Sequence, residues 1–220
     1  GEFLQEEYKD AFNIDGWFYS PALRKAHGNG NVSFIPNHLH LAGIKRLDYV
    51  KPNIYVGSAT YPDKHGYISL SLSNTYEKRM IKEADIVILE INKNYPRTFG
   101  DVEIHYSEID YLVETDYPVP VLGDALPSEK DMLIGASIAE LIKDGDCLQL
   151  GIGGIPNAVA SYLKDKKDLG VHTEMMTSGM VELAELGVIN GSRKTLHKGK
   201  IVCTFALGNK KLYDFLDDNP

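Results

Sequence analysis

The chain has 220 residues, of which 43% are hydrophobic and 25% charged, values that are ordinary for a globular protein with a substantial core. Its formal net charge of −8 argues against a surface built for nucleic acid or anionic membranes. No stretch approaches the roughly 20 apolar residues that a membrane helix needs, and no signal peptide is recognisable, so we expect a cytoplasmic protein. Cys147 and Cys203 lie in apolar runs and are expected to be small buried thiols.

The first half of the chain predicts strands separated by loops and one helix. Residues 1–30 are polar and interrupted by glycine, which favours irregular structure. Strands are predicted at 31–35 and 53–57, and a helix at 75–83. The continuous apolar run at 85–91 is typical of a strand covered on both faces.

A break follows at residues 117–127, where three prolines and a glycine resist regular structure. We therefore predict two domains, residues 1–124 and 125–220. Their fold class is α/β, with two open and mostly parallel sheets, the second apparently incomplete.

The second half alternates regularly between helix and strand. Ser128 is expected to cap a helix that runs to about residue 143, ends at Gly145 and carries its apolar side chains on one face. Those side chains are Ile134, Ile138, Leu141 and Ile142. Strands are then predicted at 147–151, 170–173 and 200–205, and helices at 156–164, 180–186 and 209–216. This alternation indicates right-handed βαβ units and a parallel sheet.

The most informative motif is LGIGGIPN at residues 150–157, followed by VHTEM at 171–175. A glycine turn between a strand and a helix gathers backbone N–H groups that can hold an anion. Glu174 then follows at the distance of the acidic residue that binds a cofactor ribose, but Pro156 replaces the third glycine of the dinucleotide fingerprint. The alternatives are a nucleophilic Glu174 beside an oxyanion hole at Gly153 and Gly154, or a structural turn with a solvated glutamate.

Several further motifs accompany this pair along the chain. They are DKHGY at 63–67, GDVEIHYSEID at 100–110, KDKKDLG at 164–170, KTLHKGK at 194–200 and KLYDF at 211–215. Together with the glycine turn and HTEM at 172–175, they resemble the acetyl-CoA hydrolase/transferase family, in particular its 4-hydroxybutyrate and butyryl-CoA:acetate CoA-transferase branch. The resemblance extends over most of this chain but only over a middle portion of the family's longer chains.

The resemblance implies a CoA-transferase that moves CoA between a short-chain acyl-CoA and a carboxylate such as acetate. Glu174 would be the catalytic residue, forming an acyl-glutamyl anhydride and then a glutamyl-CoA thioester. Gly151, Gly153 and Gly154 would supply the oxyanion-hole region close to CoA. Coenzyme A would be a substrate, with no metal or redox cofactor, and the protein would be a homo-oligomer.

Two other functions stay open from the sequence. One is an acyl-CoA hydrolase of the same fold, in which water meets the anhydride, and the other is a noncatalytic module that binds CoA or a nucleotide.

Some histidines and tyrosines are weaker candidates. His65 and Tyr67, in the DKHGY turn, are possible walls of the substrate pocket, as are Tyr55 and Tyr61. His38 and His40 alternate as on one strand face but have no third ligand nearby, which makes a metal site a minor alternative. His105 is expected to be structural.

Overall fold

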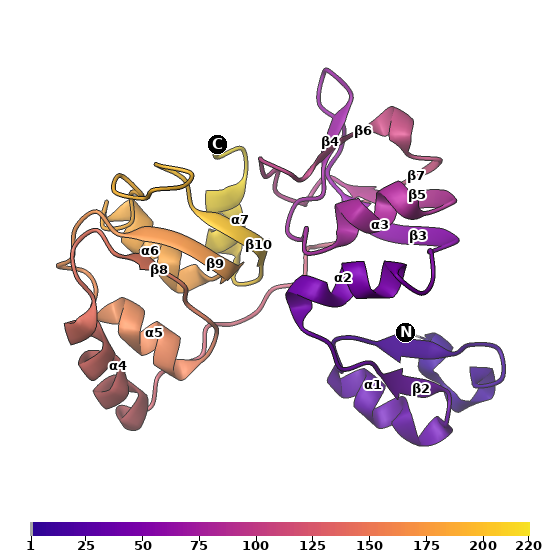
Figure 1. Cartoon of the computed structure of the whole chain (residues 1–220), viewed down its shortest axis with the longest axis horizontal. Helices are drawn as coiled ribbons and strands as arrows, with labels where there is room; N and C mark the ends of the chain where they lie inside the picture. The colour runs from indigo at the N-terminus through magenta and orange to yellow at the C-terminus, as the bar shows by residue number, and fades with distance from the viewer. Residues whose placement is uncertain (1) are drawn as a thin grey trace. The chain divides into compact units, whose positions relative to one another are not determined.

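The computed structural model describes residues 2–220 (Figure 1), and they divide into two compact units between Lys51 and Pro52. The first unit contains β1 (Ile14–Gly16) and β2 (Val32–Phe34), which pair in parallel. Its helical elements are η1 (Glu2–Leu4), η2 (Glu6–Tyr8), α1 (Pro21–Ala26), η3 (His27–Asn29) and α2 (Leu39–Leu47). The strand predicted at 31–35 is confirmed.

Two expectations for the first unit are wrong. Residues 1–30 are not irregular throughout, because Ser20 accepts a hydrogen bond from the Leu23 N–H and Pro21 occupies the first turn of α1. His38 and His40 do not alternate on a strand, since His38 precedes α2 and His40 lies within it. Local capping signals overrode the polar composition in the first case, and helical periodicity overrode the alternation in the second.

The second unit begins with a three-stranded parallel sheet in the order β3-β5-β7. Its strands are β3 (Ile54–Ala59), β5 (Ile86–Asn92) and β7 (Tyr111–Thr115), and α3 (Glu77–Glu83) connects the first two. The short strands β4 (Tyr67–Ser69) and β6 (Glu103–His105) pair in antiparallel although α3 and β5 lie between them in the chain, and η4 (Tyr106–Glu108) follows β6. Side chains from these elements form one hydrophobic core.

Strand β5 is not covered on both faces as its apolar run suggested. Val87, Leu89 and Ile91 are buried in the core, whereas Ile86 is exposed and Ile88 only partly buried. The run of aliphatic residues therefore predicted the strand correctly, but it did not reveal that only one face of β5 is fully buried in this chain.

Residues 116–128 adopt neither helix nor strand, as their prolines predicted, and the chain then builds a second parallel sheet in the order β10-β9-β8. Its strands are β8 (Cys147–Leu148), β9 (Gly170–Met176) and β10 (Val202–Ala206). The helices are α4 (Glu129–Leu141), α5 (Gly154–Ser161), α6 (Ser178–Glu185) and α7 (Lys210–Leu216). A second core joins this sheet to its helices. The predicted alternation of strands and helices is confirmed, and the boundary between residues 124 and 125 stays a prediction.

Helix α4 begins as predicted but packs through a different face. Ser128 and Asp131 form a capping box at its start. Gly135 faces α5 so closely that a Cβ there would lie 2.7 Å from that of Ala158, and the two helices run side by side (Figure 1). The apolar side chains expected to share a face are largely outside the core, and Leu141 is 76% exposed. Small residues, not large ones, make this helix contact.

Cys147 also differs from expectation. It is exposed, because β8 is only two residues long and lies at the edge of its sheet, whereas Cys203 on β10 is partly buried. Burial raises the pKa of the Cys203 thiol. Among residues 2–220, no helix is long and apolar enough to cross a membrane.

Candidate active site

The glycine motif forms a turn that leads directly into α5. Gly153 is the N-cap residue, with φ +118° and ψ −175°, a backbone conformation that only glycine adopts readily. The first N–H groups of a helix have no partner inside it and point outward from its start. Pro156 lies in the first turn of α5, where its missing N–H costs nothing.

The strand register places this turn beside Glu174. Cys147 and Leu148 of β8 pair with Gly170 and Val171 of β9, an offset of 23 residues. The same offset persists beyond β8, because the Thr173 hydroxyl donates to the Leu150 carbonyl over 3.1 Å. This bond brings the segment that enters the glycine turn alongside the part of β9 that carries Glu174.

Glu174 lies within β9 and not after its end, since β9 continues to Met176. Its side chain is exposed, and those of Thr173 and Met175 on either side are buried. On the other flank, the Thr204 hydroxyl donates to the Glu174 carbonyl over 2.7 Å, which fixes β10 against this part of β9. Glu174 thus carries an exposed carboxylate on β9, alongside the segment that leads into the glycine turn.

His65 and Tyr67 belong to a different part of the second unit. The Asp63 carboxylate accepts hydrogen bonds from the backbone N–H groups of Tyr67 (2.9 Å) and His65 (2.8 Å), which closes the turn before β4. These two bonds and the Arg97 guanidinium, 3.3 Å away, hold the pKa of Asp63 below its usual value. Within residues 2–220, no hydrogen bond or ring contact links this turn to Glu174 or the glycine motif.

His105 has the structural role that was expected. Its ring accepts from the Ser107 N–H in a capping box that starts η4, and it stacks on Tyr106 with ring centroids 4.8 Å apart. Gly66 is required here, because a Cβ would come within 2.6 Å of both rings.

Tyr61 and Tyr55 have separate surroundings. The Tyr61 hydroxyl donates to Glu114 over 3.3 Å on the protein surface. Tyr55 lines a cavity of about 400 Å³ that also includes Glu77, Tyr95 and Phe205. Burial raises the pKa of Tyr55 and keeps its hydroxyl neutral. Such a cavity is large enough for a small ligand, and Phe205 lies on β10 next to the strand that carries Glu174.

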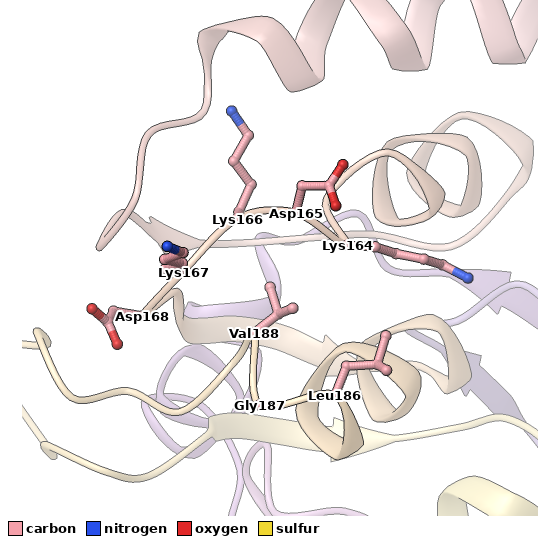
Figure 2. Close-up of a pocket in the computed structure, with 8 residues that line it drawn as sticks. All are labelled: Lys164, Asp165, Lys166, Lys167, Asp168, Leu186, Gly187 and Val188. Carbon is pink, nitrogen blue, oxygen red and sulfur yellow. The ribbon is translucent and has the colours of Figure 1, made fainter.

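Another cavity, of about 430 Å³, is lined by residues 164–168, just before β9, and by residues 186–188. Neither the glycine turn nor Glu174 lines it. Figure 2 shows its lysine side chains pointing in different directions. Lys164 pairs with Glu182 at 2.5 Å, and Lys166 donates to the Ile142 carbonyl at 2.6 Å. Two of its three ammonium groups are therefore already engaged, and the cavity is not built as an anion cradle.

The described residues contain no group of three or more side chains arranged to hold a metal ion. The rings of His38 and His40 do approach each other, with centroids 5.7 Å apart, but they have no third ligand in that set.

Three residues at or beside β9 were not singled out by the sequence. His172 projects from the same strand two residues earlier, and His197 approaches it from a distant loop with ring centroids 6.3 Å apart. Lys194 is only 8% exposed and anchors that loop to β9. The alternation of β9 was sufficient to find His172, whereas the other two depend on tertiary structure.

The turn conformation makes a testable prediction. Replacing Gly153 with alanine is expected to lower the free energy of unfolding by about 1–3 kcal/mol, because alanine is strained at this φ and ψ. Gly151→Ala is the matched control: both positions have open space for a Cβ, but Gly151 does not have a positive φ. Urea denaturation of the two variants measures the difference, and equal stabilities would contradict the strain argument.

Comparison with known proteins agrees with these features. The family profile of the acetyl-CoA hydrolase/transferase N-terminal domain matches residues 2–123. A 4-hydroxybutyrate coenzyme A transferase of Clostridium kluyveri is 42% identical over all of this chain and 52% of its own length. A succinyl-CoA:cyclohexane-1-carboxylate CoA transferase of Geobacter metallireducens is 41% identical over all of this chain and 50% of its own length.

Solved structures give the same answer for the fold. The crystal structure of RipA from Yersinia pestis matches 99% of this chain and 52% of that one, with a TM-score of 0.94 and 33% identity. A 4-hydroxybutyrate CoA-transferase from Porphyromonas gingivalis matches 98% of this chain and 58% of that one, with a TM-score of 0.82 and 35% identity. The chain spans about half the length of the curated relatives it matches. On the profile match over residues 2–123, this chain belongs to the acetyl-CoA hydrolase/transferase family.

Proposed function

We propose that this protein transfers CoA between a short-chain acyl-CoA and a carboxylate, with Glu174 as the covalent nucleophile. The observation that supports the proposal is the pairing of β8 with β9 together with the Thr173–Leu150 hydrogen bond, since both run the segment before the glycine turn alongside the strand that carries Glu174. Several relatives are named CoA-transferases, which supports the same reaction class.

The proposed reaction needs only an ionised carboxylate and donors for the oxyanion. A Glu174 oxygen attacks the thioester carbonyl carbon, the C–S bond breaks, and CoA thiolate leaves behind an acyl-glutamyl anhydride. The thiolate then attacks the glutamyl carbonyl, which releases the first carboxylate and forms a glutamyl-CoA thioester. The acceptor carboxylate reverses both steps, so no proton or electron is consumed overall.

The glycine turn would stabilise the negative charge that develops on the carbonyl oxygen. The amide groups of Gly153 and Gly154 lie at the start of α5, where the helix dipole favours negative charge. Donors already in place contribute most when the surrounding structure excludes water. We therefore assign Gly151, Gly153 and Gly154 to the oxyanion region, and coenzyme A to the role of substrate, with no cofactor.

The names of the relatives suggest that the acyl group derives from a short carboxylic acid. The names of the relatives include 4-hydroxybutyrate, butyrate and succinyl groups, and the last of these carries a second carboxylate. For this chain we propose butyryl, 4-hydroxybutyryl or related short acyl groups. His65, in the turn before β4, and Tyr67, at the start of β4, stay candidates for the pocket wall.

Trapping the intermediate tests this function. The protein is incubated with butyryl-CoA without acceptor, reduced with borohydride and digested for peptide mass analysis. We expect the glutamyl-CoA thioester at Glu174 to be reduced to its primary alcohol, with every other glutamate unchanged. Reaction without any altered Glu174 would contradict the proposal.

The same preparation separates a transferase from a hydrolase. Butyryl-CoA and acetate should yield acetyl-CoA faster than free CoA appears. Release of free CoA at the same rate with and without acetate would instead identify a hydrolase.

A further inference from the structure

The cavity that Tyr55 lines combines several aromatic rings with a single charge. Its volume of about 400 Å³ lies near the lower end of the roughly 300–1,000 Å³ found for small-molecule pockets. Its aromatic lining consists of Tyr55, Tyr95, Phe205 and Tyr213. Among the described residues that line it, Glu77 is the one acidic side chain, and none is basic. A cavity of this kind does not suit an anion such as a carboxylate or acyl-CoA.

The walls of the cavity are held together by contacts between distant segments of the second unit. Ser73 and Phe205 form an antiparallel bridge, which joins the segment before α3 to β10. The Tyr213 hydroxyl of α7 donates to the Pro120 carbonyl over 2.8 Å. The shape of the cavity is therefore fixed by bonds within this chain.

Gly57 allows the Tyr55 side chain to lie along β3 at the cavity wall. A Cβ at Gly57 would come within 2.7 Å of both the ring and the hydroxyl of Tyr55. Within residues 2–220, neither the Tyr55 hydroxyl nor the Tyr95 hydroxyl takes part in a hydrogen bond. In that same part of the chain, no ring contact joins the four aromatic side chains of the cavity to one another. Their rings therefore keep surface that a ligand can contact.

Glu77 holds its carboxylate in one orientation at the start of α3. The carboxylate accepts hydrogen bonds from the Ser73 hydroxyl and, over 2.8 Å, from the Tyr76 N–H. Burial, and then the nearby charge of Glu77, raise the pKa of the Tyr55 hydroxyl, which stays neutral. Each carboxylate oxygen has two lone pairs, so Glu77 can still accept from a ligand. The cavity thus has a fixed negative charge beside a neutral aromatic wall.

We propose that this cavity binds a small organic cation, a molecule with a trimethylammonium or alkylammonium group. Such a cation is attracted by the negative faces of aromatic rings, most strongly where it is removed from water. Glu77 adds the attraction of an opposite charge, and no basic side chain of the lining competes for it. The site does not depend on the reaction proposed for Glu174, because none of the residues assigned to CoA transfer lines the cavity.

Choline and its neutral analogue, in which a carbon atom replaces the nitrogen, test this site because they have the same shape and differ in charge. The whole 220-residue chain, labelled in its tyrosine ring carbons, is titrated with each compound by NMR. We expect choline to shift the Tyr55 and Tyr95 signals and to bind about tenfold more tightly than the analogue, as one partly desolvated cation–π contact predicts. Equal affinities would reveal an apolar cavity only and overturn the proposal, as would no binding of choline or shifts that leave both tyrosines unchanged.

The charge of the cavity is tested with Glu77→Gln, which retains a carbonyl oxygen for the Tyr76 N–H. This variant should bind choline about tenfold more weakly and the neutral analogue as well as the wild type does. Glu140→Gln, an exposed glutamate on α4, is the matched control and should change neither affinity. Unchanged choline affinity in Glu77→Gln would contradict the proposal.

The aromatic wall is tested with Tyr55→Leu and Tyr95→Leu, each checked for folding by urea denaturation. Either variant should reduce the preference for choline to less than about threefold, because leucine has no ring face. Tyr111→Leu, at an exposed position outside the cavity, should keep the preference. A preference that survives in both cavity variants, or choline displaced equally well by sodium ions, would indicate general charge attraction and refute the site.

Discussion

Glu174→Gln is expected to reduce CoA transfer by at least about a thousandfold, because an amide oxygen cannot replace the carboxylate nucleophile. The side chain is exposed on β9 and the substitution keeps its size, so the free energy of unfolding should stay within about 0.5 kcal/mol of the wild type. Acetyl-CoA formation from butyryl-CoA and acetate measures the first effect and urea denaturation the second.

Two further variants sharpen this result. Glu174→Asp keeps the carboxylate but withdraws it by one C–C bond, and a displacement of this size is expected to cost about a hundredfold. Glu140→Gln, an exposed glutamate on α4, serves as the matched control and should leave the rate unchanged. Undiminished transfer by Glu174→Gln would remove the covalent mechanism altogether.

The sequence predicted the fold well wherever a local signal decided the structure. Ser128 started α4 as its capping pattern indicated, and the spacing of strands and helices after residue 145 yielded the parallel sheet. Leu141 shows where such reasoning ended. Helical periodicity placed it on an apolar face, but the helix packs through Gly135, and a contact between two small residues has no periodic hydrophobic signal.

Only those parts of the candidate site that follow from spacing along the chain could be predicted from the sequence. The glycine turn and Glu174 were visible as a spaced pair, because neighbouring parallel strands carry them to the same edge. The length of β9 was underestimated, so Glu174 lies on the sheet face instead of beyond a strand end. His197 is 23 residues from Glu174, on a loop whose position depends on Lys194, and neither periodicity nor spacing locates it.

Lys194→Met is expected to lower the free energy of unfolding by about 2–4 kcal/mol. Methionine retains most of the aliphatic stem, which lies so close to Gly170 that a Cβ there would be 2.5 Å from the Lys194 Cγ. It loses the ammonium group, however, and the carbonyls of Val171 and Lys200 each lose a donor, at about 1–3 kcal/mol for a buried unsatisfied group. Urea denaturation measures the loss.

The neighbouring Lys198 provides the matched control, because it is exposed in the same loop and Lys198→Met should change stability by no more than about 0.5 kcal/mol. Replacing a buried charge by an apolar group is neutral in some proteins, so a stable Lys194→Met would show that the loop is held by its turns alone. The position of His197 gives a second readout. If the ammonium group anchors the loop, Lys194→Met should weaken the nuclear Overhauser contact between the His172 and His197 rings, whereas Lys198→Met should leave it unchanged. If Lys194→Met keeps this contact, the ammonium group contributes to stability but does not position the His197 ring.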